Sequence, residues 1–100
     1  MKLTNEFQPI RQWAEDRGLY QKGDPKTQAL KLVEEMGELA QAILKEDQEE
    51  FEDAIGDCVV VLTNLAALNN TTIEECINSS YNVIASRKGK MVNGTFVKES

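Results

Sequence analysis

Residues 54–68 read "AIGDCVVVLTNLAAL" and are apolar on nearly every side. The run from Val59 to Leu62 consists of residues that also favour strands. However, the length of the whole stretch and the spacing of its later apolar residues favour a helix. A helix without a polar face needs partners all round, and a chain of 100 residues offers few. The stretch therefore predicts a central helix that forms the core of the fold and also the interface of a homodimer or homotetramer.

The flanking sequence predicts three more helices and a hairpin. An amphipathic pattern closed by Gly18 marks the first helix, and Asp24 before Pro25 marks the start of the second. The capping box from Thr72 to Glu75 begins the last helix, and an Asn-Gly pair between two β-prone runs indicates a hairpin. A single domain over residues 1–100 is expected, with helices over about residues 5–17, 25–45, 49–69 and 72–88 and a small ribbon over about 90–98.

The composition excludes several classes of function. A net charge of −6 argues against nucleic acid binding, because duplex binding is driven by basic contacts that release counterions. The absence of histidine excludes a Ser-His-Asp or Cys-His nucleophile system and the usual zinc sites. No apolar run approaches about 20 residues, and the first residues do not resemble a signal peptide. We therefore expect a cytoplasmic protein with no membrane partner, whose chemistry uses carboxylates, lysines, arginines and hard metal ions.

Acidic residues interrupt the two most apolar segments. Glu34, Glu35 and Glu38 share a helix face, because residues three and four apart are neighbours. Asp57 lies inside the central apolar run, where burial without a partner would cost several kcal/mol. Acids that face one another from two antiparallel helices offer only oxygen ligands, which suit Mg²⁺, or Mn²⁺ in its place. Because Mg²⁺ is commonly bound by carboxylates together with substrate phosphates, the cluster also predicts a phosphate-bearing substrate.

The order of these motifs resembles a known family. The segment "EEMGE" at residues 34–38, followed by "IGD" ending at Asp57 and an apolar helix, is similar to the MazG-like nucleoside triphosphate pyrophosphohydrolases, whose signature is EExxE and then ExxD on the next helix. The resemblance covers about residues 10–90, and the "RKGKMVNGTF" ending is most similar to the short bacteriophage members. It implies an all-α fold, the four-helix bundle of the all-α NTP pyrophosphatases, that dimerises or tetramerises. It also implies magnesium-dependent hydrolysis of a nucleoside triphosphate to a monophosphate and pyrophosphate.

The resemblance also implies roles for individual acids. Carried over residue by residue, it assigns magnesium binding to Glu35, Glu38 and Asp57, and orientation or deprotonation of the attacking water to Glu34. The chain departs from the signature at Ala54, where the glutamate of ExxD would fall. Asp53, one residue earlier, is a candidate to replace that ligand, and Glu50, which with Asp53 makes the literal ExxD, is the alternative.

Five residues are candidate substrate contacts. Lys31 lies one turn before the paired glutamates and can meet a triphosphate or be a solvated lysine. Asn82 matches an asparagine of the family's last helix. Arg87 and Lys88 belong to the only basic cluster, which either complements a helix C-terminus or attracts polyphosphate, including across a subunit interface. Trp13 is either a core residue or a platform for a base.

A second interpretation, in which the protein is not an enzyme, also fits the sequence. The missing glutamate at Ala54 is compatible with a helical oligomeric interaction or regulatory module that keeps a vestigial acidic site and does not catalyse. Incubation with mixed triphosphates and magnesium separates the two readings, because only an enzyme releases pyrophosphate.

Overall fold

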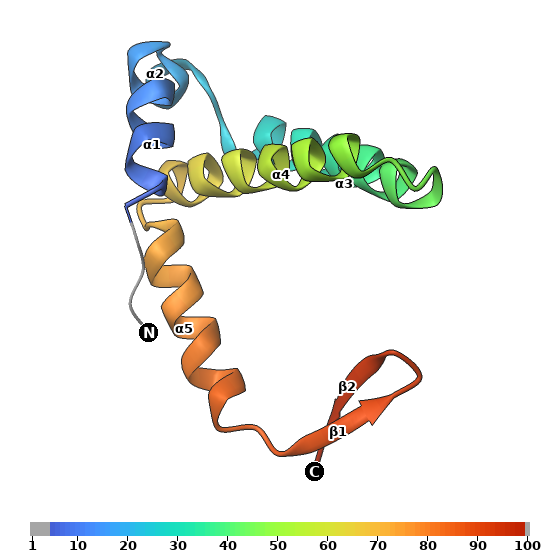
Figure 1. The fold of residues 1–100 in the computed structure, drawn as a ribbon. Coiled ribbons are helices and arrows are strands. Elements are labelled where there is room, and N and C mark those ends of the chain that lie inside the picture. The colour runs from blue at the N-terminus through green and yellow to red at the C-terminus, as the bar shows by residue number, and fades with distance from the viewer. Residues whose placement is uncertain (1–4, 100) are drawn as a thin grey trace.

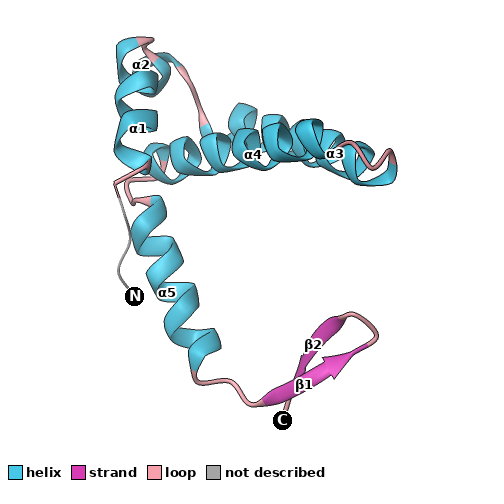
Figure 2. Cartoon of the chain, viewed as in Figure 1, coloured by secondary structure: helices cyan, strands magenta, loops and turns pink. Residues whose placement is uncertain are grey.

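The computed structural model describes residues 5–99, so residues 1–4 and 100 of the predicted domain lie outside the described residues. Figure 1 shows the elements in chain order, which are α1 (Phe7–Asp16), α2 (Leu19–Lys22), α3 (Pro25–Leu44), α4 (Gln48–Leu68), α5 (Ile73–Ala85), β1 (Gly89–Val92) and β2 (Thr95–Lys98). The two strands pair antiparallel, with Met91 opposite Phe96. The predicted all-α fold with a small C-terminal hairpin is confirmed (Figure 2).

Side-chain caps begin the three longest helices. Asp24, Asp47 and Thr72 each accept a hydrogen bond from the backbone N–H three residues on, at 2.9, 3.0 and 3.1 Å respectively. Pro25 follows the first of these caps at the first helical position, where its missing N–H costs nothing. Such a cap contributes about 0.5–2 kcal/mol to stability. Because each cap bonds to a residue three positions away, the start of each of these helices is set by neighbouring residues.

The segment from residue 18 to 24 differs from the sequence prediction, which had a loop there. The structure contains the one-turn helix α2, entered through Gly18 at a φ of 76°, where glycine is favoured. The Tyr20 hydroxyl donates a hydrogen bond to Asn64 Oδ1 on α4 at 2.6 Å. Since this partner is 44 residues away, apolar periodicity could not reveal the turn.

Helices α3 and α4 form an antiparallel pair, and α1 packs on α4. The buried apolar residues of the described chain are mostly small, which allows close approach of the helices; they are Ala14, Ala42, Ala54, Cys58, Val61 and Ala66. Helix α5 contacts α4 and then runs away from the other helices (Figure 1). The radius of gyration is 15.9 Å, against about 13 Å for a compact chain of this length. The predicted bundle is therefore not closed within one chain, because its fourth long helix points outward.

An ion pair holds the start of α5 against α1. Arg11 Nη1 and Nη2 donate to Glu74 Oε1 and Oε2 at 2.6 and 2.7 Å, and both side chains are partly buried. The guanidinium lowers the pKa of the Glu74 carboxyl. The stability that this shift provides is present above the ordinary pKa of glutamate and is lost as the pH falls through the lower, folded-state pKa.

We therefore expect Arg11→Met to lower the free energy of unfolding by about 1–2 kcal/mol at pH 7, because a partly buried carboxylate loses its partner. Urea unfolding at pH 7 and at pH 3 measures the effect, which should shrink at the lower pH. Arg17→Met is the matched control, because it also removes a guanidinium, but one that lies over the Trp13 ring at 4.6 Å, so its effect should not depend on pH. An equal loss at both pH values in Arg11→Met would contradict the prediction.

Among the described residues, no helix is both long enough and apolar enough to cross a membrane.

Candidate metal centre

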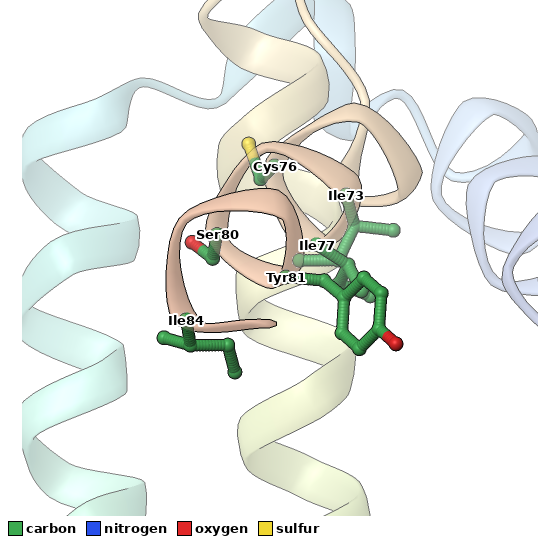
Figure 3. A pocket seen from close by; sticks show the side chains of 6 residues that line it. All are labelled: Ile73, Cys76, Ile77, Ser80, Tyr81 and Ile84. Atoms are coloured by element: carbon green, nitrogen blue, oxygen red, sulfur yellow. The ribbon is translucent and has the colours of Figure 1, made fainter. Parts of the chain in front are cut away.

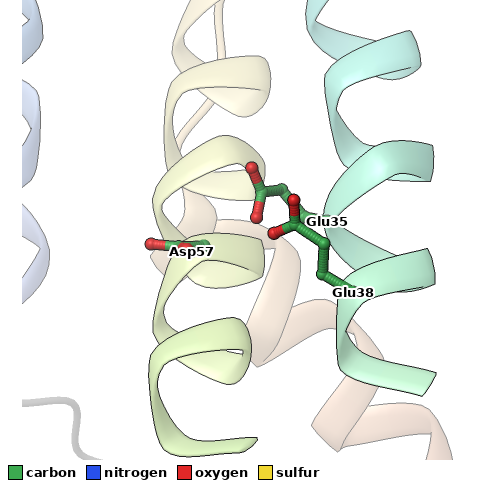
Figure 4. A group of neighbouring side chains, drawn as sticks. All are labelled: Glu35, Glu38 and Asp57. Atoms are coloured by element: carbon green, nitrogen blue, oxygen red, sulfur yellow. The ribbon is translucent and has the colours of Figure 1, made fainter. Parts of the chain in front are cut away.

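Acids of α3 and α4 meet midway along the two helices. Glu35, Glu38 and Asp57 each offer one carboxylate oxygen, and these oxygens lie within 4.8 Å of one another. Figure 4 shows the two glutamates reaching from α3 towards α4, which carries the aspartate. The structure thus brings together the three acids that were predicted to share a cation, and their role as ligands remains a prediction.

Glu35 is the buried member of this group, with 6% of its surface exposed. Its Oε1 lies 3.2 Å from Lys31 Nζ, but its Oε2 is buried without a hydrogen-bond partner among the described residues. A buried carboxylate oxygen without a partner is costly, and a cation beside it would remove that cost. In the part of the chain that the structure describes, the group consists of three carboxylates with no nitrogen or sulfur ligand, which suits a hard divalent ion such as Mg²⁺ or Mn²⁺.

The acids also disfavour one another's ionised forms. Desolvation, followed by the charges of Asp53 and Glu35, raises the pKa of Asp57. The charge of Glu35 is the largest of the effects that raise the pKa of Glu38. A divalent cation in the group would oppose both shifts, because positive charge favours the carboxylate forms.

The candidates for a fourth ligand lie along one groove. Asp53 and Glu50 line a groove of about 230 Å³ together with Glu38. The charge of Asp53 is one of the causes that raise the pKa of Asp57, so Asp53 lies close to that carboxyl group. Ala54, at the position of the missing glutamate, is buried and lines the same groove. Asp53 is therefore the better placed candidate, although it lies outside the group of three.

Glu34 and Lys31 lie at the edge of the group. Glu34 is exposed, and its Oε2 is 3.7 Å from Lys31 Nζ. Lys31 therefore contacts both paired glutamates of α3, and their charges together raise the pKa of its ammonium group. The ammonium group of Lys31 thus places positive charge beside the acids, at a point where a bound triphosphate would also need it.

Trp13 lies on a second groove that reaches the acidic group. This groove has a volume of about 460 Å³ and is lined by Pro9, Ile10, Trp13, Asp57 and Val60. Trp13 is 47% exposed, and the guanidinium of Arg17 lies over its ring at 4.6 Å. The sequence prediction missed the apolar wall made by Pro9 and Ile10, although their spacing from Trp13 by four and three residues places them on one helix face.

The remaining predicted contacts do not approach the acids within one chain. Asn82 belongs to the far half of α5, and Arg87 and Lys88 follow that helix; all three are exposed. Since α5 runs away from α3 and α4, this segment lies apart from the helix pair that carries the acids (Figure 1). Their proposed role in substrate binding therefore requires another copy of the chain or a movement of α5.

Comparisons with known proteins match the region that carries the acids. Residues 24–92 match the MazG nucleotide pyrophosphohydrolase domain. An uncharacterized 18.2 kDa protein in the rep-hol intergenic region of Haemophilus phage HP1 (strain HP1c1) is 46% identical over 68 residues, which cover 68% of this chain and 42% of that protein. The chain thus spans less than half the length of this relative. No solved structure matches the chain. Because the family match covers most of the chain, including all of α3, α4 and α5, the protein belongs to the MazG nucleotide pyrophosphohydrolase family.

Proposed function

We propose that the protein is a magnesium-dependent pyrophosphohydrolase that converts a nucleoside or deoxynucleoside triphosphate to the monophosphate and pyrophosphate. The observation that supports it most is the buried Glu35 oxygen that has no hydrogen-bond partner within residues 5–99, inside a group of three carboxylates. The family to which the chain belongs supplies the reaction class. Mn²⁺ is expected to substitute for Mg²⁺, because the same oxygen ligands suit both ions.

Each acid has a distinct task in this proposal. Glu35, Glu38 and Asp57 hold the metal, and Asp53 is the candidate for a fourth carboxylate. When bound, Mg²⁺ supplies the positive charge that offsets the triphosphate and the Lewis acidity that activates water. Glu34 accepts a proton from the attacking water.

The water oxygen forms a bond to the α-phosphorus, and the bond from that phosphorus to the oxygen bridging the α- and β-phosphates breaks. Pyrophosphate leaves with the electron pair of the broken bond. Lys31, beside the acids, contributes positive charge to the departing phosphates.

A substrate panel in labelled water tests the proposal. Purified protein with Mg²⁺ and ordinary, deoxy or damaged triphosphates should yield monophosphate and pyrophosphate in equal amounts. In water enriched in ¹⁸O, the label should enter the monophosphate, because attack occurs at the α-phosphorus. Diphosphate with inorganic phosphate would contradict the proposal. No product from any nucleotide would favour the non-catalytic interaction module that Ala54 suggests.

The groove beside Asp57 suits a nucleobase, because it combines an apolar wall with a half-exposed indole. We expect Trp13→Ala to raise KM about tenfold with little change in kcat, since stacking on an aromatic ring contributes about 1–3 kcal/mol per base. Trp13→Phe, which keeps an aromatic face, should retain most of the affinity. Steady-state kinetics with one nucleotide measures both variants, and an unchanged KM in Trp13→Ala would exclude stacking there.

A further inference from the structure

The two oxygens of the buried Glu35 carboxylate have different surroundings. Lys31 Nζ lies 3.2 Å from Glu35 Oε1, and it also lies 3.7 Å from Glu34 Oε2. Both contacts come from within α3, because residues three and four positions apart are neighbours on a helix. The other oxygen, Glu35 Oε2, is buried and has no hydrogen-bond partner within residues 5–99. Oε1 is thus held by a cation of the chain, and Oε2 remains for an ion.

The burial of Glu35 strengthens this difference. An ion pair is stronger where little water surrounds it, and the Glu35 side chain is only 8% exposed. The Lys31 side chain is about half exposed and also contacts the exposed Glu34, so its ammonium group approaches from the edge of the acidic group. Lys31 therefore leaves the space between Glu35, Glu38 and Asp57 open.

Ca²⁺ and Mg²⁺ use carboxylate oxygens differently. Ca²⁺ takes about six to eight oxygen ligands at roughly 2.3–2.6 Å, and some of its carboxylates bind through both oxygens. Mg²⁺ requires a nearly ideal octahedron at about 2.0–2.1 Å and keeps several waters. The two oxygens of one carboxylate are too close together to fill adjacent corners of so small an octahedron. A glutamate that can offer only one oxygen therefore suits Mg²⁺ better than Ca²⁺.

We propose that Lys31 sets the metal selectivity of the acidic group by limiting Glu35 to a single ligand oxygen. With Lys31 on Oε1, the group offers one oxygen each from Glu35, Glu38 and Asp57, and waters or substrate phosphates complete the octahedron of Mg²⁺. Without Lys31, Glu35 can turn both oxygens to a larger ion such as Ca²⁺. Lys31 is in this role a positioning residue, because it acts through Glu35. The inference rests on the metal centre of the proposed function but not on the reaction.

Ion binding to the whole chain reports on this group. Within residues 5–99, it is the only set of three cysteine, aspartate or glutamate side chains whose ligand atoms meet. The groove of about 400 Å³ on α5 has no acidic residue; it is lined by Ile73, Cys76, Ile77, Ser80, Tyr81 and Ile84 (Figure 3). Glu35→Gln, which removes the buried acid, should accordingly abolish the binding of Mn²⁺.

Competition for bound Mn²⁺ tests the role of Lys31. Mn²⁺ on the full chain is followed by electron paramagnetic resonance and displaced with Mg²⁺ or with Ca²⁺, without nucleotide. Lys31→Met should shift the ratio of the two affinities towards Ca²⁺ by at least about tenfold, an effect typical of residues that orient metal ligands. The loss of a positive charge alone would leave this ratio unchanged, because it would strengthen the binding of both divalent ions to a similar extent.

Lys26→Met is the matched control, because Lys26 lies in the first turn of α3 and has no ion pair among the described residues. It should leave the ratio of affinities unchanged, and circular dichroism verifies that both variants retain their helices. A ratio in Lys31→Met within about threefold of the wild type would overturn the proposal. An equal shift in Lys26→Met would overturn it as well.

Infrared spectroscopy tests how Glu35 binds the ion. Relative to the wild type, Ca²⁺-loaded Lys31→Met should gain a band at the lower asymmetric stretching frequency of a carboxylate that binds through both oxygens. No gain of this band would overturn the proposal. If the wild type binds no Mn²⁺, the metal centre and the role of Lys31 both fail. If the ion-binding results are as expected but no pyrophosphate is released, only the proposed function fails.

Discussion

Glu35→Gln is expected to lower kcat by about 10³-fold without unfolding the protein. Glu35 is the buried acid of the group, and one of its oxygens has no partner within the described chain. An amide has nearly the same shape but provides only one weak oxygen ligand and carries no charge. It also turns a hydrogen-bond donor towards Glu38 and Asp57, which can hold the amide in place of a cation. The variant should therefore fold normally and fail to bind metal.

The measurement is pyrophosphate release at saturating triphosphate and Mg²⁺, with Mn²⁺ binding by calorimetry as an independent readout. Glu52→Gln is the matched control, because Glu52 is an exposed acid of α4 that hydrogen-bonds to Gln48. It should keep wild-type turnover and metal affinity. A Glu35→Gln protein with kcat within about threefold of the wild type would exclude Glu35 as a metal ligand.

Metal ions should also control the stability of the protein. At 100 times the dissociation constant, Mg²⁺ or Mn²⁺ should raise the free energy of unfolding by about 2.7 kcal/mol, which for a chain of this size shifts Tm by about 10 °C or more. Without metal, burial is the main cause that raises the pKa of Asp57, and the charge of Glu35 is the main cause that raises the pKa of Glu38. A carboxyl group whose pKa is raised by folding stabilises the folded state below its ordinary pKa. This contribution to stability is lost as the pH rises through the folded-state pKa. At pH 7 the metal-free acids therefore oppose folding.

Asp57→Asn should consequently melt at a higher temperature than the wild type when a chelator is present at pH 7. The same variant should lose most of the Tm increase on addition of Mn²⁺, and the wild-type increase should itself vanish near pH 4. Thermal unfolding with chelator and with Mn²⁺ at both pH values measures these effects. Asp16→Asn on α1, where Asp16 accepts a hydrogen bond from Gln12, is the control. A lower Tm for Asp57→Asn in chelator, or an undiminished metal response, would contradict the prediction.

The acidic group could be predicted from the sequence because its geometry is local. Glu35 and Glu38 are neighbours on any helix, and a short connector brings the facing turn of the next helix, with Asp57, to the same level. The helix starts at Asp24 and Thr72 could be predicted for the same reason, since each cap bonds to a residue three positions away.

The sequence by itself thus determined the four long helices, the caps at Asp24 and Thr72, the hairpin and the meeting of the three acids. Only the tertiary structure decided that α2 forms, that Trp13 shares a groove with Asp57, and that α5 carries its basic segment away from the acids. These features depend on contacts such as those of Tyr20 with Asn64 and Arg11 with Glu74, whose partners are 44 and 63 residues apart. Contacts of that kind follow from how whole helices pack, because periodicity within a helix specifies which face is apolar but not which surface will cover it.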